Sequence, residues 1–169
     1  MKTILSYLKD GDLRSIGRVP EVVEIVLADP KLFEHLIQGM MHQDPGIRMR
    51  SSDAVEKITR QKPEYLCSHK DFILNDVAIQ TQQEVRWHLA QIIPRLELTD
   101  EEIKIASLEL FSYLDDTSKI VQANALQALV DLAWKNDALL PRVKDAVRKL
   151  AEIGSPAVKN KAKKLLNKL

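Results

Sequence analysis

The residues of this sequence that could carry out chemistry are few and widely spaced. The four histidines are His35, His42, His69 and His88, and none forms the His-x-x-x-His pair of a zinc-binding helix. Cys67 is two residues from His69, which is too little to predict a nucleophile paired with a base. The sequence therefore predicts no metal site and a buried or incidental Cys67.

Motifs for phosphate binding and for nucleophilic catalysis are also missing from the sequence. It contains neither a Gly-rich phosphate loop nor a Gly-x-Ser-x-Gly turn. The adjacent acids Asp115–Asp116 and Glu101–Glu102 are explained by turn and helix-capping chemistry. We therefore expect no cofactor and no enzymatic activity.

The composition is that of an ordinary soluble domain. Of the 169 residues, 45% are hydrophobic and 29% are charged, and the formal net charge is +1. This charge gives no overall attraction to nucleic acid or to an anionic membrane. A single cysteine fits a reducing compartment, and no apolar run approaches the roughly 20 residues of a membrane span. We expect a cytoplasmic protein without a membrane partner.

The elements that position the side chains follow a helical pattern that recurs four times. In the copy that begins at Val121, apolar residues return four, seven, eight and eleven positions later, on one helix face. The other copies begin at Ile47, Val85 and Val158, so successive starts are 38, 36 and 37 residues apart. A period near 37 residues is typical of a helical-repeat solenoid. We call these four residues the template starts.

Local signals place the ends of several helices. Asp29-Pro30 and Asp44-Pro45 each combine a capping carboxylate with a proline in the first turn. Thr99 and Glu102 have the spacing of a capping box, and Pro94 should kink the helix that contains it. We also expect a helix over about 20–28 and a short helix at 13–16. The predicted domain has an N-terminal cap at 1–28 and helix pairs at 29–61, 62–97, 98–135 and 136–169.

The segments around the template starts carry a family resemblance. They read Asp44-Pro45-Gly46-Ile47-Arg48, Glu84-Val85-Arg86, Lys119-Ile120-Val121-Gln122 and Ser155-Pro156-Ala157-Val158-Lys159. Over roughly residues 30–169 they resemble the Asp-Pro-x-Val-Arg-x-x-Ala-x-x-Ala-Leu-x-x-Leu pattern of HEAT repeats. The resemblance implies an all-α fold, a right-handed α-solenoid of about four HEAT-like helix pairs with an N-terminal helical cap. It also implies that Asp44, Asp116, Arg48 and Arg86 are structural, as members of an incomplete Asp–Arg ladder.

The same resemblance predicts a binding surface, because second helices line the concave face of such a solenoid. The residues opposite the apolar template that we expect to bind a protein or peptide are Arg50, Trp87, His88, Gln91, Arg95 and Gln127. Tryptophan and arginine are favoured as interface anchors. Trp87 could instead fill the groove between repeats, and we expect Trp134 to be a packing residue. The main hypothesis is a non-enzymatic scaffold for an unidentified protein partner.

The uneven charge supports an alternative, nucleic-acid binding. From Arg142 to Leu169 there are nine basic and two acidic residues, against 16 basic and 22 acidic before them. The candidate phosphate-binding residues are Lys159, Lys161, Lys164 and Lys168. These lysines could equally form the polar outer face that a terminal repeat needs.

A minor alternative is an enzyme. DNA alkylation-repair glycosylases and phycobilin lyases use related repeats. A pocket beside Trp87 that holds a carboxylate would favour such an activity.

Overall fold

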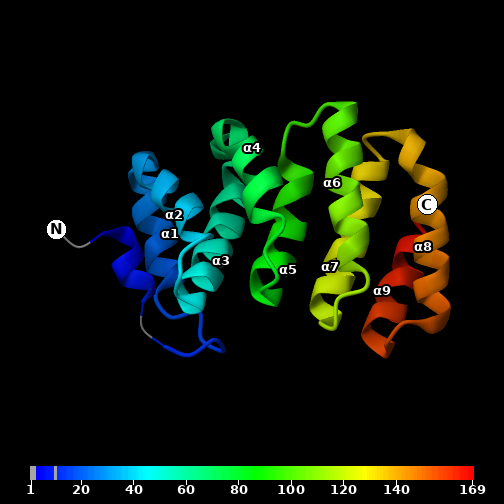
Figure 1. Cartoon of the computed structure of the whole chain (residues 1–169), viewed down its shortest axis with the longest axis horizontal. Coiled ribbons are helices and arrows are strands. Elements are labelled where there is room, and N and C mark those ends of the chain that lie inside the picture. Colours follow the sequence, from blue (N-terminus) through cyan, green and yellow to red (C-terminus); the bar gives the residue numbers. More distant parts are fainter. Residues whose placement is uncertain (1–2, 10) are drawn as a thin grey trace. The chain divides into compact units, whose positions relative to one another are not determined.

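The computed structural model describes residues 3–9 and 11–169, which form helices joined by turns (Figure 1). No strand occurs within this described part of the chain, so the all-α prediction is confirmed. The chain consists of two compact units, Met1–Leu96 and Glu97–Leu169. None of the helices among residues 3–9 and 11–169 combines the length and the apolar character that a bilayer crossing requires.

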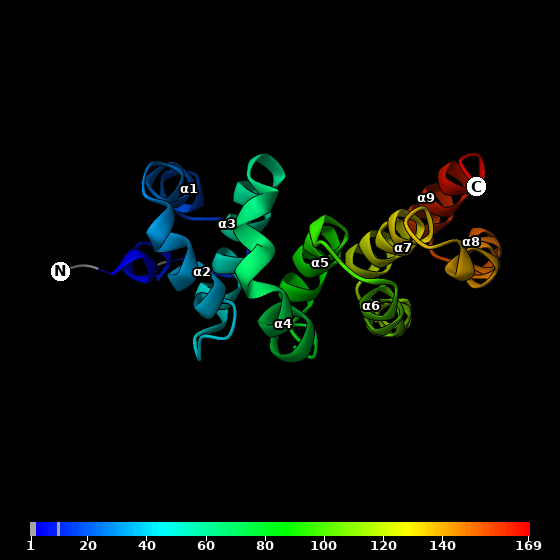
Figure 2. The same cartoon turned by 90° about the horizontal axis from the view of Figure 1, so that it is seen from above.

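The first unit is built around one long helix, α3 (Pro45–Gln61). α1 (Val19–Ala28), α2 (Phe33–Gly39) and α5 (Gln83–Ile92) all pack against it (Figures 1 and 2). Gly39 permits a close approach between α2 and α3, since a Cβ there would lie 2.4 Å from the Ser51 hydroxyl oxygen. α1 corresponds to the helix that the sequence predicts over about 20–28.

The predicted helix starts in this unit are confirmed. The Asp44 side chain accepts from the backbone N–H groups of Gly46 and Ile47, and Pro45 occupies the first turn of α3. Asp29 accepts in the same way from Lys31 at the start of a 3-10 turn that leads into α2. These caps satisfy backbone donors that have no partner inside the helix.

Residues 62–82 are less regular than a helix pair implies. A 3-10 segment at Pro63–His69 precedes α4 (Lys70–Phe72), and a π-helical segment follows at Ile73–Val77. The chain then enters α5, which ends at Ile92, and Pro94 lies in a 3-10 turn at Ile93–Arg95. The regular helix therefore stops just before this proline, as the missing N–H predicts.

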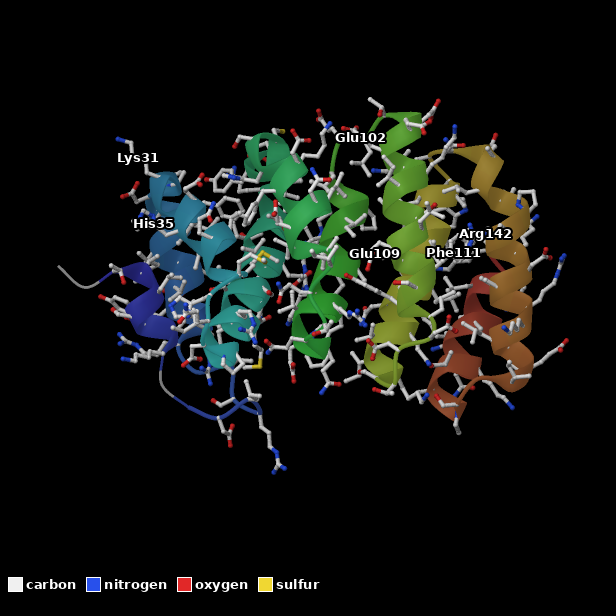
Figure 3. The ribbon with its side chains drawn as sticks, in the orientation of Figure 1. Lys31, His35, Glu102, Glu109, Phe111 and Arg142 are labelled. Atoms are coloured by element: carbon white, nitrogen blue, oxygen red, sulfur yellow. The ribbon has the colours of Figure 1, made fainter. Side chains whose placement is uncertain are left out.

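The second unit contains α6 (Asp100–Tyr113), α7 (Lys119–Ala133), α8 (Leu140–Ile153) and α9 (Pro156–Leu166). α7 is central and contacts the other three helices (Figure 1). Thr99 and Glu102 form both hydrogen bonds of the predicted capping box at the start of α6. On this unit's surface the Arg142 guanidinium lies 3.9 Å from the ring centre of Phe111 (Figure 3), a cation–π contact between α8 and α6.

All four template starts are buried, with exposed fractions between 0% and 4%. The apolar face that the sequence pattern predicts is therefore the packed face in both units. Trp134 is a correction, because its exposed fraction is 54%. Its backbone is still helical and its N–H bonds the Val130 carbonyl, but it lies on a different side of the helix from the buried Val121 and Leu132.

Candidate functional site

Arg50 is predicted to lie on the binding surface, but it is buried in the structure. Its side chain is completely buried in α3. Nε donates to the Ser15 carbonyl at 3.0 Å, Nη1 to the Leu8 carbonyl at 2.9 Å, and Nη2 to the Asp12 carbonyl at 2.6 Å. The expectation that Arg50 meets a partner is therefore wrong, because its guanidinium binds the chain's own N-terminal segment.

The loop that Arg50 holds replaces the short helix expected at 13–16. Gly11 and Gly17 have positive φ angles of 107° and 52°, in the left-handed region that favours glycine. A Cβ on Gly11 would also lie 3.0 Å from Arg50 Nη2. Two glycine turns and one arginine thus fix the loop against α3, with Leu13 and Ile16 45% and 51% exposed.

A cavity of about 320 Å³ lies among this loop, α3 and α5. Its lining residues are Leu13, Arg14, Ser15, Ile16, Met49, Arg50, Asp53, Trp87 and His88. Apolar side chains from all three elements provide the walls, and Trp87 is half-buried beside them. Three residues of the predicted set, Arg50, Trp87 and His88, therefore line one cavity within the first unit. A carboxylate in a pocket beside Trp87 is the feature expected to favour an enzyme. Asp53 supplies such a carboxylate in this cavity.

Asp53 and His88 form the polar part of the lining. The side chain of Asp53 is 8% exposed and that of His88 is 13% exposed. Asp53 Oδ1 accepts a hydrogen bond from Lys57 and lies 3.9 Å from His88 Nε2. Asp53 Oδ2 and His88 Nδ1 are both buried and have no hydrogen-bond partner. Both atoms are thus enclosed by the packing around α3 and α5.

His88 is neutral at pH 7 because its surroundings oppose protonation. Burial lowers the pKa of His88 below its ordinary value of 6.5, while the charges of Asp53 and Glu56 partly oppose this shift. Gln91 hydrogen-bonds the imidazole. That bond favours the protonated imidazole and so acts against the effect of burial on the pKa of His88. Gln91 is not among the residues that line the cavity, and it is connected to the lining by its hydrogen bond to His88.

Arg95 is engaged with α3. Its Nη1 donates to the Glu56 carbonyl at 2.7 Å and to Thr59 Oγ1 at 3.0 Å, and Nη2 lies 2.5 Å from Glu56 Oε1. Arg60 donates to the same carboxylate. Burial raises the pKa of Glu56, but the hydrogen bonds from Arg95 and Arg60 outweigh it and hold the pKa below 4.5. This ion pair joins the 3-10 turn after α5 to α3 and uses donors of Arg95 that the sequence pattern predicts to bind a partner.

Asp53, Glu56 and His88 could also be considered as metal ligands, since their ligand atoms lie within 4.8 Å of one another. Three cations already occupy the carboxylates: Lys57 on Asp53, and Arg60 with Arg95 on Glu56. A metal ion would have to displace these partners and tolerate their charge. The cluster is therefore better described as part of the α3–α5 contact.

Gln127, the remaining residue of the predicted set, belongs to the second unit. It donates to Asp131 Oδ1 at 2.8 Å and accepts from Lys161 Nζ at 2.7 Å. Burial lowers the pKa of Lys161 and raises that of Asp131. Of the lysines in the alternative set, Lys161 is thus half-buried and paired, Lys159 is half-buried, and Lys164 and Lys168 are exposed.

A recurring contact follows the template starts. Arg48 Nη1 donates to the His42 carbonyl at 2.8 Å, and Arg86 Nε donates to the Gln80 carbonyl at 2.8 Å. Gln122 Nε2 makes the equivalent bond to the Asp116 carbonyl at 2.7 Å. In each case the donor follows a template start and reaches the carbonyl six residues earlier. Arg48 Nε also donates to Gln82 Oε1 at 2.7 Å, so Arg48 has a structural role, as the resemblance implies.

A second cavity, of about 360 Å³, contains Cys67 and His69. Cys67 is exposed, so of the two expectations for it, buried or incidental, the first is wrong. His69 Nδ1 lies 3.5 Å from Glu34 Oε2, and its ring lies 5.7 Å from that of Phe33. His69, the last residue of the 3-10 segment Pro63–His69, therefore packs against α2.

Comparisons with known proteins identify the fold and nothing more specific. No family model matches the chain, and no curated protein matches it. A crystal structure of an engineered protein is similar, with a TM-score of 0.65 over 97% of this chain and 76% of that chain. The two sequences are 15% identical, so this similarity supports the helical architecture alone.

Proposed function

We propose that this chain is a HEAT-like α-solenoid that acts as a non-enzymatic adaptor for a protein partner. Two observations support the repeat architecture. The template starts recur at intervals of 36 to 38 residues and are all buried. The carbonyl contacts of Arg48, Arg86 and Gln122 recur at equivalent positions. The engineered structure supports the all-helical fold alone.

The cavity beside Trp87 is the observation that carries the binding proposal. It combines a half-buried tryptophan with apolar walls and polar atoms that lack partners. Interface anchors commonly pair an aromatic side chain with such a recess. Arg50 and Arg95 hold together the elements around this cavity, since their donors bond to groups within the first unit.

Removing the Trp87 ring tests the proposal. Affinity capture with the purified chain should retain at least one protein that Trp87→Ala loses, and the interaction should be reproduced with both proteins purified. Trp134→Ala is the matched control, because it removes an exposed tryptophan from the second unit. Equal capture of every protein by wild type and Trp87→Ala would exclude this surface.

A second candidate, an alkylation-repair-like activity, is favoured by the Asp53 carboxylate in the cavity. Under this proposal Trp87 would stack on a damaged base and Asp53 would stabilise positive charge on the sugar. Incubation with methylated duplex DNA should then release free base, and Asp53→Asn should abolish the release. No release by the wild-type chain would remove this candidate.

A further inference from the structure

We infer that the cavity beside Trp87 receives an apolar side chain of the protein partner, together with a carboxylate that neighbours this side chain in the partner's sequence. That the guest belongs to a protein rests on the proposed function. The chemistry of the guest rests on the lining of the cavity, which combines apolar walls with an excess of positive charge.

Two large apolar side chains of the N-terminal loop are open to solvent at this cavity. Leu13 and Ile16 are 45% and 51% exposed, and both belong to the lining. Met49 of α3, which is 6% exposed, and the half-buried Trp87 of α5 complete the apolar walls. An apolar guest would remove these surfaces from water, which favours binding.

Polar contacts, rather than its apolar side chains, hold this loop in place. Arg50 donates to the carbonyls of Asp12 and Ser15, which flank the residues between them. The backbone N–H of Arg14 donates to Asp12 Oδ1 at 2.9 Å. The walls are therefore positioned before a guest arrives, and this preorganisation lowers the cost of binding.

The charges of the lining favour an anion. Its charged residues are Arg14, Arg50 and Asp53, and Asp53 is already paired with Lys57. Arg14 is exposed, and no residue in the described part of the chain forms an ion pair or a hydrogen bond with its guanidinium. A carboxylate beside an apolar guest would therefore meet an unused guanidinium, whose planar fork matches its two oxygens.

The buried charge of Arg50 acts in the same direction. Its guanidinium donates to three neutral backbone carbonyls, and among residues 3–9 and 11–169 no carboxylate forms an ion pair with it. Arg50 is completely buried, so a guest cannot touch it. A charge in a poorly solvated place still acts at a distance more strongly than one in water, so an anion at the cavity gains from Arg50 without contact.

The size of the cavity and the charge of the unit favour a guest with one side chain and one charge. About 320 Å³ is at the small end of ligand pockets, which span roughly 300–1,000 Å³. The first unit, Met1–Leu96, has 13 basic and 13 acidic residues, so it exerts no long-range attraction on a polyanion. A short apolar and acidic stretch of a protein meets these conditions better than a nucleic acid does.

Binding of N-acetyl-phenylalanine tests the site, because this probe joins an apolar ring to a carboxylate. In a Trp134→Phe background, the fluorescence of Trp87 reports on the cavity, and we expect a saturable change. N-acetyl-phenylalanine amide, which keeps the side chain but lacks the charge, should bind about threefold to fivefold more weakly. Equal binding of the acid and the amide would overturn the inference.

Variants separate the charge from the walls. Arg14→Gln should weaken the acid to the level of the amide and leave the amide unchanged, whereas Lys31→Gln, at another exposed cation of the first unit, should change neither. Ile16→Ser should weaken both probes by about threefold or more, whereas Ile79→Ser, at a 65% exposed position outside the lining, should not. All four side chains are exposed, so we expect each variant to fold, which circular dichroism checks. A preference for the acid that survives Arg14→Gln would overturn the inference.

Other occupants give distinct results. Tighter binding of adenosine monophosphate than of N-acetyl-phenylalanine would assign the cavity to nucleic acid and overturn the inference. If a captured protein depends on Trp87, but neither depends on Arg14 nor competes with N-acetyl-phenylalanine, the adaptor proposal stands and this inference falls. If N-acetyl-phenylalanine binds as expected but no protein depends on Trp87, the chemistry of the site stands and the adaptor proposal falls.

Discussion

At the residue scale, Arg50 shows how a polar position predicted to face solvent can belong to the core. It lies three residues past the buried template start Ile47, and residues three apart are neighbours on a helix, so the position borders the apolar face. The N-terminal segment covers that position and supplies three carbonyls, from residues 35 to 42 positions earlier in the chain. Burial of a charged side chain requires such partners, and they come from a part of the sequence that no local pattern connects to α3.

Replacing Arg50 should release the N-terminal loop. Arg50→Lys cannot reach three carbonyls in a fork, so we expect a loss of roughly 2 to 5 kcal/mol in the free energy of unfolding. Trypsin should also cleave faster after Arg14, which is exposed in the loop. Arg48→Lys is the control, because that arginine bonds the His42 and Gln43 carbonyls. Unchanged cleavage after Arg14 in Arg50→Lys would contradict the assigned role.

The neutral state of His88 predicts a dependence of stability on pH. Because burial lowers the folded pKa below 6.5, the unfolded chain binds more protons between the two pKa values. The contribution of His88 is therefore complete above the unfolded pKa and is lost as the pH falls through the folded one. Asp53, Glu56 and Lys57 on α3 are the charged groups that act on this titration.

Urea unfolding of wild type and His88→Gln at about pH 7.5 and about pH 5.5 measures this effect. We expect the wild type to lose more free energy of unfolding than His88→Gln over this interval. His35→Gln should behave as wild type, since His35 is exposed on α2 (Figure 3). Glu56 does not contribute to the change in free energy of unfolding between these two pH values, because its lowered pKa places its titration at lower pH.

The candidate site was predictable in part at this scale. Trp87 and His88 follow from their positions on the face opposite the template, and Asp53 occupies the corresponding face of α3. Spacing cannot show that Asp53 Oδ2 and His88 Nδ1 are buried without partners, because this depends on the loop that closes over them. It also cannot show that Arg95 reaches Glu56, which lies 39 residues earlier.

At the scale of the elements, predictions that depend on neighbouring residues were the ones confirmed. The caps at Asp44 and Thr99 use donors two or three residues away, so the sequence contains both partners. The irregular stretch at 62–82 lacks such a signal. Its π-helical segment at Ile73–Val77 places Ile73 and Val77 in the core at the cost of regular hydrogen bonding, a balance that only packing determines.

The packed face of α7 predicts the effect of one core substitution. Leu129 is fully buried in the helix that contacts α6, α8 and α9. Leu129→Ala should cost roughly 2 to 5 kcal/mol in the free energy of unfolding, because it leaves a cavity among these helices. Ile120→Ala on the same helix is the control and should cost far less, since Ile120 is 55% exposed. Equal melting temperatures for wild type and Leu129→Ala would show that this position is not core.

At the scale of the whole molecule, the two units repeat one pattern of polar contacts. Asp53, six past its template start, lies 3.9 Å from His88, three past the next start. Gln127 and Lys161 hold the same relative positions and form a 2.7 Å hydrogen bond. The residue types at the equivalent positions differ, so sequence similarity does not reveal the equivalence. The contacts between the helices reveal it. Within each unit, one helix that carries a template start therefore contacts the other through the same two positions.

The basic C-terminal stretch provides the last prediction. Lys161 is paired with Gln127, whereas Lys163, Lys164 and Lys168 are exposed on or just after α9. Duplex DNA should therefore bind weakly, with a slope of about −3 in log affinity against log salt. Fluorescence anisotropy between about 50 mM and about 200 mM salt measures this slope. Lys164→Gln/Lys168→Gln should reduce its magnitude by about 2, whereas Lys31→Gln/Lys62→Gln, which alters exposed lysines of the first unit, should not. Strong binding that persists at the higher salt, or that ignores Lys164 and Lys168, would mean that phosphate contacts lie elsewhere and would favour a nucleic-acid function over the adaptor.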